Sequence, residues 1–99
     1  MAISVQVRAF SGAVETTCTH PAIPSLCQRA SRLGMPMLGF VDPYDDTVFN
    51  RSQMRLVIPE LRKLADDSPA DEAQAARELI RLASRIEHET HRYLLFNGD

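Results

Sequence analysis

Residues 66–72 read DDSPADE and predict the boundary between two long helices. Ser68 is suited to the N-cap of the second helix, and Pro69 to its first turn, where a proline loses no helical hydrogen bond. Asp71 and Glu72 then lie near the positive end of that helix. The helix is predicted to run to about position 89 with one apolar face. That face comprises Ala73, Ala76, Leu79, Ile80, Ala83 and Ile86.

The segment before this boundary predicts another amphipathic helix. Asn50 can cap its start, because Gln53 three residues later completes a capping-box pattern. Pro59 falls inside the helix and is expected to remove one backbone hydrogen bond and to kink it. The apolar residues of this helix are Met54, Val57, Ile58, Leu61 and Leu64.

The N-terminal third predicts one strand and one short helix. Residues 3–10, ISVQVRAF, alternate along the chain as in a strand with one buried face. Residues 13–23 are expected to be irregular, since prolines at 21 and 24 forbid a continuous helix before position 24. A helix then begins at Pro24 and ends at Gly34, which suits a left-handed cap.

Two further strands are expected later in the chain. The apolar run MLGFV at 37–41 predicts a buried strand, and the following DPYDDTVFNR predicts a loop. Tyr93 to Phe96 predicts a C-terminal strand. The element order is therefore β-α-β-α-α-β, and the predicted fold class is α/β, with α+β as the alternative. We expect a three-stranded sheet with three helices, whose first crossover is right-handed if its strands are parallel.

Length and composition limit the classes of function. The 99 residues (11.1 kDa) predict a single domain over positions 1–99 that buries an ordinary hydrophobic core. The net charge of −2 gives no general attraction to nucleic acid or to anionic lipid, so neither is an expected partner. No apolar stretch reaches membrane-spanning length, and the N-terminal sequence does not resemble a signal peptide. We expect a cytoplasmic protein.

The two cysteines do not predict a metal site. Cys18 and Cys27 form no CxxC pair and have no histidine nearby at zinc-ligand spacing. Cys27 falls on the apolar side of a predicted helix, whereas Cys18 is expected in a Thr-rich loop with a partly exposed thiol. A bridge between them would need an oxidising compartment, which nothing else in the sequence supports.

Three aspartates surround a tyrosine in the predicted loop: Asp42, Tyr44, Asp45 and Asp46. One hypothesis is a docking surface, with the tyrosine as an aromatic anchor and the carboxylates facing a basic partner. A second is a solvated turn, because Asp-Pro is common turn chemistry. A calcium loop is a third, although the expected ligand spacing and central glycine are missing. A second acidic edge consists of Asp66, Asp67, Asp71 and Glu72.

A basic face with two histidines carries the alternative hypothesis. Arg77, Arg81 and Arg85 recur every four residues, so they form one ridge that either binds an anion or is a solvated, salt-bridged face. His88 and His91 are three residues apart, not four as in the zinc-protease helix, so metal binding is not expected. A small enzyme or anion-binding protein would use these five side chains.

The acidic segment also carries a resemblance. The stretch from Asp42 to Arg51, together with the terminal YLLFNGD at 93–99, resembles a class of small, uncharacterised bacterial proteins. In size, acidity and lack of a catalytic motif the chain is similar to bacterial immunity proteins, which bind a toxin and block it. The predicted element order is similar to that of barstar-like inhibitors of basic ribonucleases, a comparison of fold alone.

These observations predict a non-enzymatic protein-binding module. No nucleophile elbow, dinucleotide loop or phosphate loop is present, so no catalytic residue and no cofactor is assigned. The leading hypothesis is an immunity protein that occludes the active site of a cognate toxin with a basic surface. Its oligomeric state is expected to be monomer or homodimer, and an accessory homodimeric subunit built on a free sheet edge is a further alternative.

Overall fold

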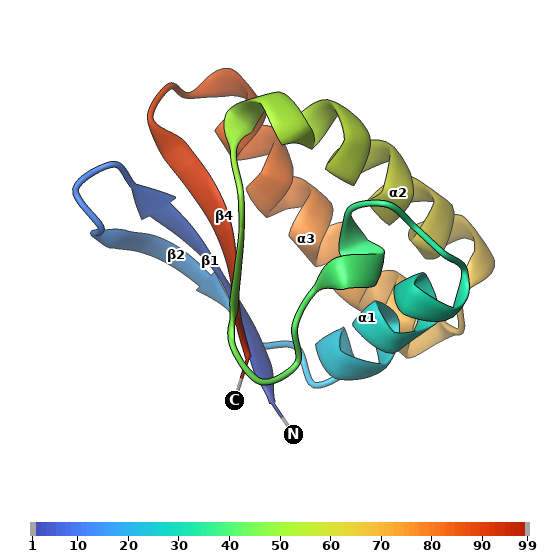
Figure 1. Cartoon of the computed structure of the whole chain (residues 1–99). Helices are drawn as coiled ribbons and strands as arrows, with labels where there is room; N and C mark the ends of the chain where they lie inside the picture. The colour runs from blue at the N-terminus through green and yellow to red at the C-terminus, as the bar shows by residue number, and fades with distance from the viewer. Residues whose placement is uncertain (1, 99) are drawn as a thin grey trace.

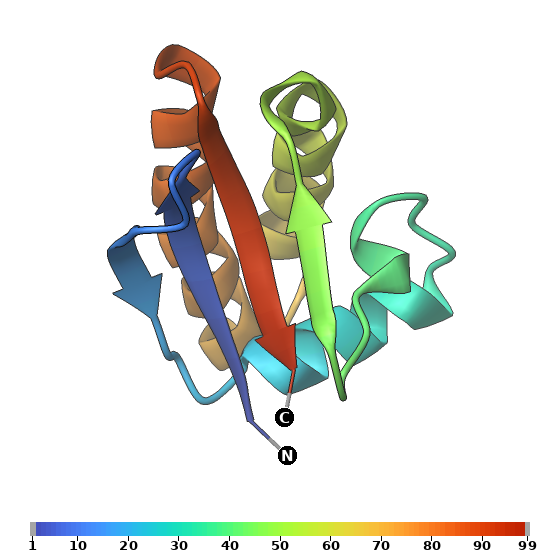
Figure 2. The ribbon, with the colours of Figure 1, turned by 60° about the vertical axis from the view of Figure 1, so that its left-hand side comes forward.

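A four-stranded antiparallel sheet carries three helices on one face in the computed structural model, which describes residues 2–98 (Figure 1). Figure 2 shows the other face of the sheet, with the helices behind it. The elements in chain order are β1 (Ile3–Ala9), β2 (Val14–Cys18), α1 (Ile23–Arg32), the 3₁₀ turn η1 (Leu38–Phe40), β3 (Asp46–Phe49), the 3₁₀ turn η2 (Arg51–Gln53), α2 (Met54–Asp67), α3 (Ala70–His88) and β4 (Arg92–Gly98).

The two ends of the chain form the centre of the sheet. The strand order is β2-β1-β4-β3, and every neighbouring pair is antiparallel. β1 pairs with β4 along its whole length, from Ile3 opposite Gly98 to Ala9 opposite Arg92. β2 and β3 are the two edge strands, and within the described part of the chain β3 pairs with β4 alone.

The predicted α/β fold with three strands is therefore wrong, because the sheet is antiparallel and the fold is α+β. β2 lies in the region 13–23 that was expected to be irregular, and β3 lies in the expected loop 42–51. β1 and β2 join through a tight turn at Gly12, whose φ of +92° is readily adopted only by glycine. The predicted similarity to barstar-like inhibitors depends on the order β-α-β-α-α-β, which the structure does not have.

The expected strand at 37–41 is replaced by the turn η1. A carboxylate from α2 explains the difference: Glu60 accepts hydrogen bonds from the backbone amides of Met37 (3.1 Å) and Leu38 (2.8 Å). These amides are thereby bonded to a side chain and not to a neighbouring strand. The apolar side chains of the segment still pack inward, and Leu38 is buried.

The capping box predicted before α2 is confirmed, whereas the Ser68 N-cap predicted for α3 is not observed. Asn50 and Gln53 form the capping box, with Gln53 N bonded to Asn50 Oδ1 (3.0 Å) and Asn50 N to Gln53 Oε1 (2.8 Å). Ser68 makes no such bond, and its buried Oγ has no hydrogen-bond partner among residues 2–98. Pro59 lies inside α2, which continues through it to Asp67.

The core lies between the sheet and the helices. β1 and β4 contribute alternate residues to it, and the expected apolar faces of α2 and α3 are buried there, apart from the half-buried Ile80. The largest fully buried side chains are Phe96, Ile23, Leu26, Met54, Leu61, Leu64, Leu79, Ile86 and Leu94. Within residues 2–98, none of the helices has the length and apolar character needed to cross a bilayer.

Candidate functional site

The four side chains of the predicted docking surface project from one turn, here named the acidic turn (residues 42–46). It follows η1, and its last residue, Asp46, begins β3. The turn lies below the sheet, beside the start of β1 and the end of β4 (Figures 1 and 2). Asp42, Tyr44, Asp45 and Asp46 are all exposed, and 71% of the accessible surface of Tyr44 remains open to solvent.

Short-range hydrogen bonds hold the backbone of the acidic turn. Asp42 Oδ1 accepts from the amide of Tyr44 and Asp45 Oδ1 from the amide of Asp46, both at 2.8 Å. Thr47 Oγ1 accepts from the amide of Asp42 at 2.9 Å. One oxygen of each of these two carboxylates therefore shapes the turn, which is the bond pattern of an Asx turn for Asp42. Each carboxyl group keeps a second oxygen for other contacts.

The end of β4 fixes the acidic turn to the sheet. The amide of Gly98 donates to the carbonyl oxygen of Asp45 at 3.0 Å. A Cβ atom at Gly98 would lie 2.6 Å from the carbonyl oxygens of Asp42 and Asp45. Only a residue without a side chain allows the two segments to approach this closely.

The carboxylates of the acidic turn have no ion-pair partner within the part of the chain that the structure describes. No lysine, arginine or histidine nitrogen of residues 2–98 lies within 4 Å of Asp42, Asp45 or Asp46. The same aspartates can therefore shape the turn and still face a partner, so the solvated-turn and docking-surface hypotheses do not exclude each other. Three negative charges are exposed together on a backbone that hydrogen bonds hold in place.

The second acidic edge is divided by the structure. Asp66 and Asp67 end α2, Asp71 lies in the first turn of α3, and all three are exposed. Figure 1 places the junction of these two helices on the far side of the helical layer from the acidic turn. Glu72 differs from them because it is buried and bonded to Arg29 of α1 (Nε to Oε1, 2.6 Å). This hydrogen bond raises the pKa of Arg29. Glu72 therefore joins two helices and is left out of the candidate surface.

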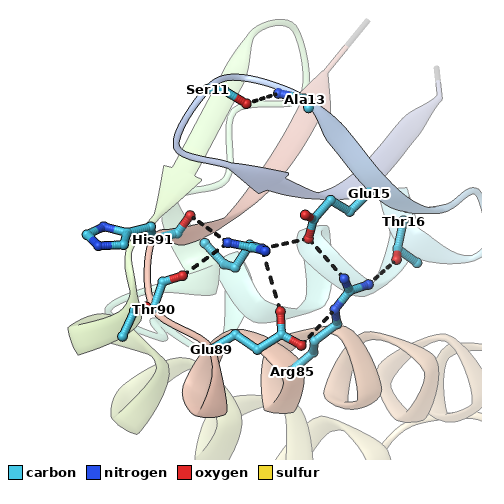
Figure 3. A network of polar contacts seen from close by, with 9 residues as sticks. Ser11, Ala13, Glu15, Thr16, Arg85, Glu89, Thr90 and His91 are labelled. Carbon is cyan, nitrogen blue, oxygen red and sulfur yellow. Dashed lines mark hydrogen bonds and ion pairs between the residues drawn. The ribbon is translucent and has the colours of Figure 1, made fainter.

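The alternative basic face does not form one site. Arg85 belongs to a network in which its guanidinium contacts Glu15 (2.9 Å), Thr16 (2.7 Å) and Glu89 (3.4 Å) (Figure 3). Arg92 reaches the same Glu15 oxygen at 2.6 Å. The network thus ties β2 to α3 and β4, a role that requires no ligand.

The two histidines point to different neighbours. His91 packs edge-on against Phe10, with ring centroids 6.0 Å apart, whereas His88 is exposed and lies 3.9 Å from the carboxylate of Glu87. Arg77 and Arg81 are exposed on α3. Among residues 2–98, no three His, Cys, Asp or Glu side chains are grouped so that they could hold a metal ion.

Both cysteines are buried and unbridged, which corrects the expected loop position and partial exposure of Cys18. Cys18 ends β2, and its thiol lies 3.8 Å from Glu78, beside His20. Burial, together with the neighbouring Glu78 charge, raises the pKa of Cys18. Burial raises the pKa of Cys27 to about 12. Both thiols are therefore protonated at neutral pH and lack the thiolate character of a nucleophile.

An apolar groove beside the acidic turn was not predicted. It has a volume of about 440 Å³ and lies between the start of β1, α1 and the segment 39–43. The residues that line it are Ile3, Pro24, Ser25, Cys27, Gln28, Ser31, Gly39, Val41 and Pro43. These residues come from three separate parts of the sequence, so only the folded chain brings them together.

Comparisons of the chain with protein-family models, with curated proteins and with solved structures give no match.

Proposed function

We propose that this protein is a non-enzymatic protein-binding module, and specifically a bacterial immunity protein that acts in the cytoplasm. The acidic turn is the surface that contacts the toxin. The observation that carries the proposal is the display of three carboxylates without ion-pair partners in residues 2–98, around an exposed tyrosine, on a backbone anchored to β4. The protonated thiols and the separated histidines also favour binding over catalysis.

The proposed mechanism is occlusion of a cationic active site. Two carboxylates about 6 Å apart repel each other by only about 0.7 kcal/mol in water, so their clustering in the free protein costs little. Opposite charges across a desolvated interface couple by about 1.5–7 kcal/mol. Tyr44 supplies a large, rigid ring that can fill a pocket of the toxin at the centre of this charge cluster.

The size of the protein is sufficient for this role. Its accessible surface is 5407 Å², and a standard interface uses about 800 Å² per partner. About one seventh of the surface would therefore be covered. The exposed aspartates at 66, 67 and 71 lie away from the acidic turn and contribute long-range attraction only.

The test removes charge from the acidic turn without removing its turn-forming hydrogen bonds. The variant is Asp42→Asn, Asp45→Asn, Asp46→Asn, because an asparagine Oδ1 still accepts the two amide bonds made by Asp42 and Asp45. The partner is the protein recovered with the native chain from its own cells, and its affinity for the purified variant is measured. We expect the affinity to fall at least about 100-fold, with a weaker salt dependence than for the native chain.

A matched variant controls for net charge. Asp66→Asn, Asp67→Asn, Asp71→Asn removes the same three charges from the acidic edge, and its expected effect is a small decrease in association rate. Equal affinities of the native chain and the acidic-turn variant, both folded, contradict the proposed function. Equal losses in the two variants show a general charge effect and also contradict it.

A further inference from the structure

The wall of the apolar groove and the acidic turn share one continuous segment, residues 39–44, which runs from the 3₁₀ turn η1 into the acidic turn. Gly39, Val41 and Pro43 line the groove, whereas the alternate residues Phe40, Asp42 and Tyr44 are exposed. Residues that line the groove therefore alternate along this segment with exposed aromatic and acidic residues. A molecule that contacts the acidic turn therefore lies directly beside the groove.

We propose that the groove binds an aliphatic side chain of the partner protein, next to an arginine or lysine of that partner which pairs with the acidic turn. This inference rests on the proposed function and specifies the chemistry of the partner. The occupant is thus a surface segment in which an aliphatic and a basic residue stand within a few positions of each other.

The composition of the groove favours this occupant. Its lining contains no charged residue, and its volume of about 440 Å³ accommodates one or two side chains. The basic residues of α1, Arg29 and Arg32, do not line it, and Arg29 is already paired with Glu72. The charge that adjoins the groove within the segment 39–44 is the carboxylate of Asp42, which stands between the lining residues Val41 and Pro43, and Asp45 and Asp46 follow it in the acidic turn. Charge complementarity then selects a cationic group beside the buried aliphatic one.

Cys27 of α1 is one of the lining residues of the groove. It is 9% exposed, and burial raises the pKa of its thiol to about 12. A charged group that entered the groove would lose hydration without an ion-pair partner among the lining residues, so an apolar occupant is favoured. The cationic group of the partner must accordingly remain at the rim, where the aspartates of the acidic turn are exposed.

The experiment uses the full chain and a random peptide library displayed on phage. Ser31→Trp fills the groove from an exposed position of α1. Ser11→Trp makes the same change in the exposed turn between β1 and β2, at the opposite end of β1, and is the matched control (Figure 1). The uncharged Asp42→Asn, Asp45→Asn, Asp46→Asn variant is the third protein. Circular dichroism and urea unfolding establish that all three are folded.

We expect the selected peptides to share an aliphatic residue within three positions of an arginine or lysine. Their affinity should fall at least about tenfold with Ser31→Trp and with the uncharged acidic turn, and should be unchanged with Ser11→Trp. Peptides that lose affinity only with the uncharged turn overturn the groove inference and leave the proposed function standing. Peptides unaffected by that variant contradict the proposed function itself.

Two further results overturn the inference. One is a selection that yields no peptide with the aliphatic and basic pair. The other is concentration-dependent dimerisation of the native chain, measured by sedimentation, that Ser31→Trp abolishes and Ser11→Trp does not. In that case the groove is occupied by a second copy of this chain.

Discussion

Gly98 lies in direct backbone contact with Asp45, and its amide donates to the Asp45 carbonyl oxygen at 3.0 Å. A methyl group at Gly98 would come within 2.6 Å of that oxygen and of the carbonyl oxygen of Asp42. Because both neighbours are backbone atoms, the clash cannot be relieved by a side-chain rotation. This contact joins the last strand to the acidic turn.

The Gly98→Ala substitution is therefore expected to lower the free energy of unfolding by about 1–3 kcal/mol, as at other overpacked sites. The measurement is urea unfolding followed by circular dichroism. Gly39→Ala is the matched control, because the nearest atom to its added Cβ is 3.3 Å away and the expected loss is smaller. A Gly98→Ala protein as stable as the Gly39→Ala protein contradicts the close approach.

Ser68 tests whether sequence pattern or structure describes the start of α3 correctly. A serine N-cap contributes typically about 1 kcal/mol, so the sequence pattern predicts that loss for Ser68→Ala. The structure gives the buried Oγ no partner, which predicts no loss or a small gain in stability.

The control for Ser68 is Asn50→Ala, which removes an observed capping box and should cost about 1 kcal/mol. Both variants are compared with the native chain by urea unfolding. A loss of similar size in the two variants shows that Ser68 does cap α3.

Glu15 is expected to contribute more to stability than an isolated surface ion pair. It accepts from Arg85 (2.9 Å) and Arg92 (2.6 Å) with one carboxylate oxygen, and its side chain is 23% exposed. We expect Glu15→Ala to lower the free energy of unfolding by about 1–2 kcal/mol, because two guanidiniums lose a shared acceptor. Faster amide exchange in β2 should accompany this loss.

Lys63→Ala provides the comparison for Glu15. Lys63 pairs with Asp67 at 3.2 Å, and both side chains are at least 60% exposed. Removal of such a pair costs less than about 0.5 kcal/mol. Equal effects of the two substitutions, or a Glu15→Ala effect that 1 M salt does not reduce, would show that the network is not a stabilising charge cluster.

The buried Cys27 thiol predicts a loss of stability in alkali. Its pKa is about 12 in the folded chain and 9.0 for an unperturbed thiol. Between these values the unfolded chain releases a proton that the folded chain retains, so the free energy of unfolding falls as pH rises. Well below pH 9 both states are protonated, and this contribution is constant.

We expect a slope of about −1.4 kcal/mol per pH unit from this thiol between about pH 9 and 12. The free energy of unfolding is measured with urea at each pH for the native chain and for Cys27→Ala, both under reducing conditions. The difference between the two pH profiles gives the contribution of the Cys27 thiol, because other groups that titrate in this range contribute equally to both. Parallel curves would show that the thiolate is tolerated in the fold.

Local patterns in the sequence predict the helices well. The capping box at Asn50 involves two residues three positions apart, and the apolar faces of α2 and α3 follow the helical period. The edge strands β2 and β3 are not predicted, because they lack such a periodic pattern of apolar residues. β2 and β3 bury only Cys18 and Phe49, so neither shows the alternation that revealed β1.

The features that define the site depend on distant contacts. The run MLGFV is apolar in either conformation, and the carboxylate that bonds to its amides is 22–23 residues away in Glu60. Arg85 and Arg92 meet Glu15 across 70 and 77 residues. The exposed residues of the acidic turn could be proposed from composition, whereas the groove beside it could not, because β1 and α1 each supply part of its wall.

The pairing of β1 with β4 governs when the fold can form during synthesis on the ribosome. Among the strands that the structure describes, β3 pairs only with β4, and β1 pairs only with the short β2 until residues 92–98 are available. During synthesis, the apolar side chains of β1 therefore lack their final partner until the seven residues of β4 emerge from the ribosome. The native sheet is completed only after β4 has been translated.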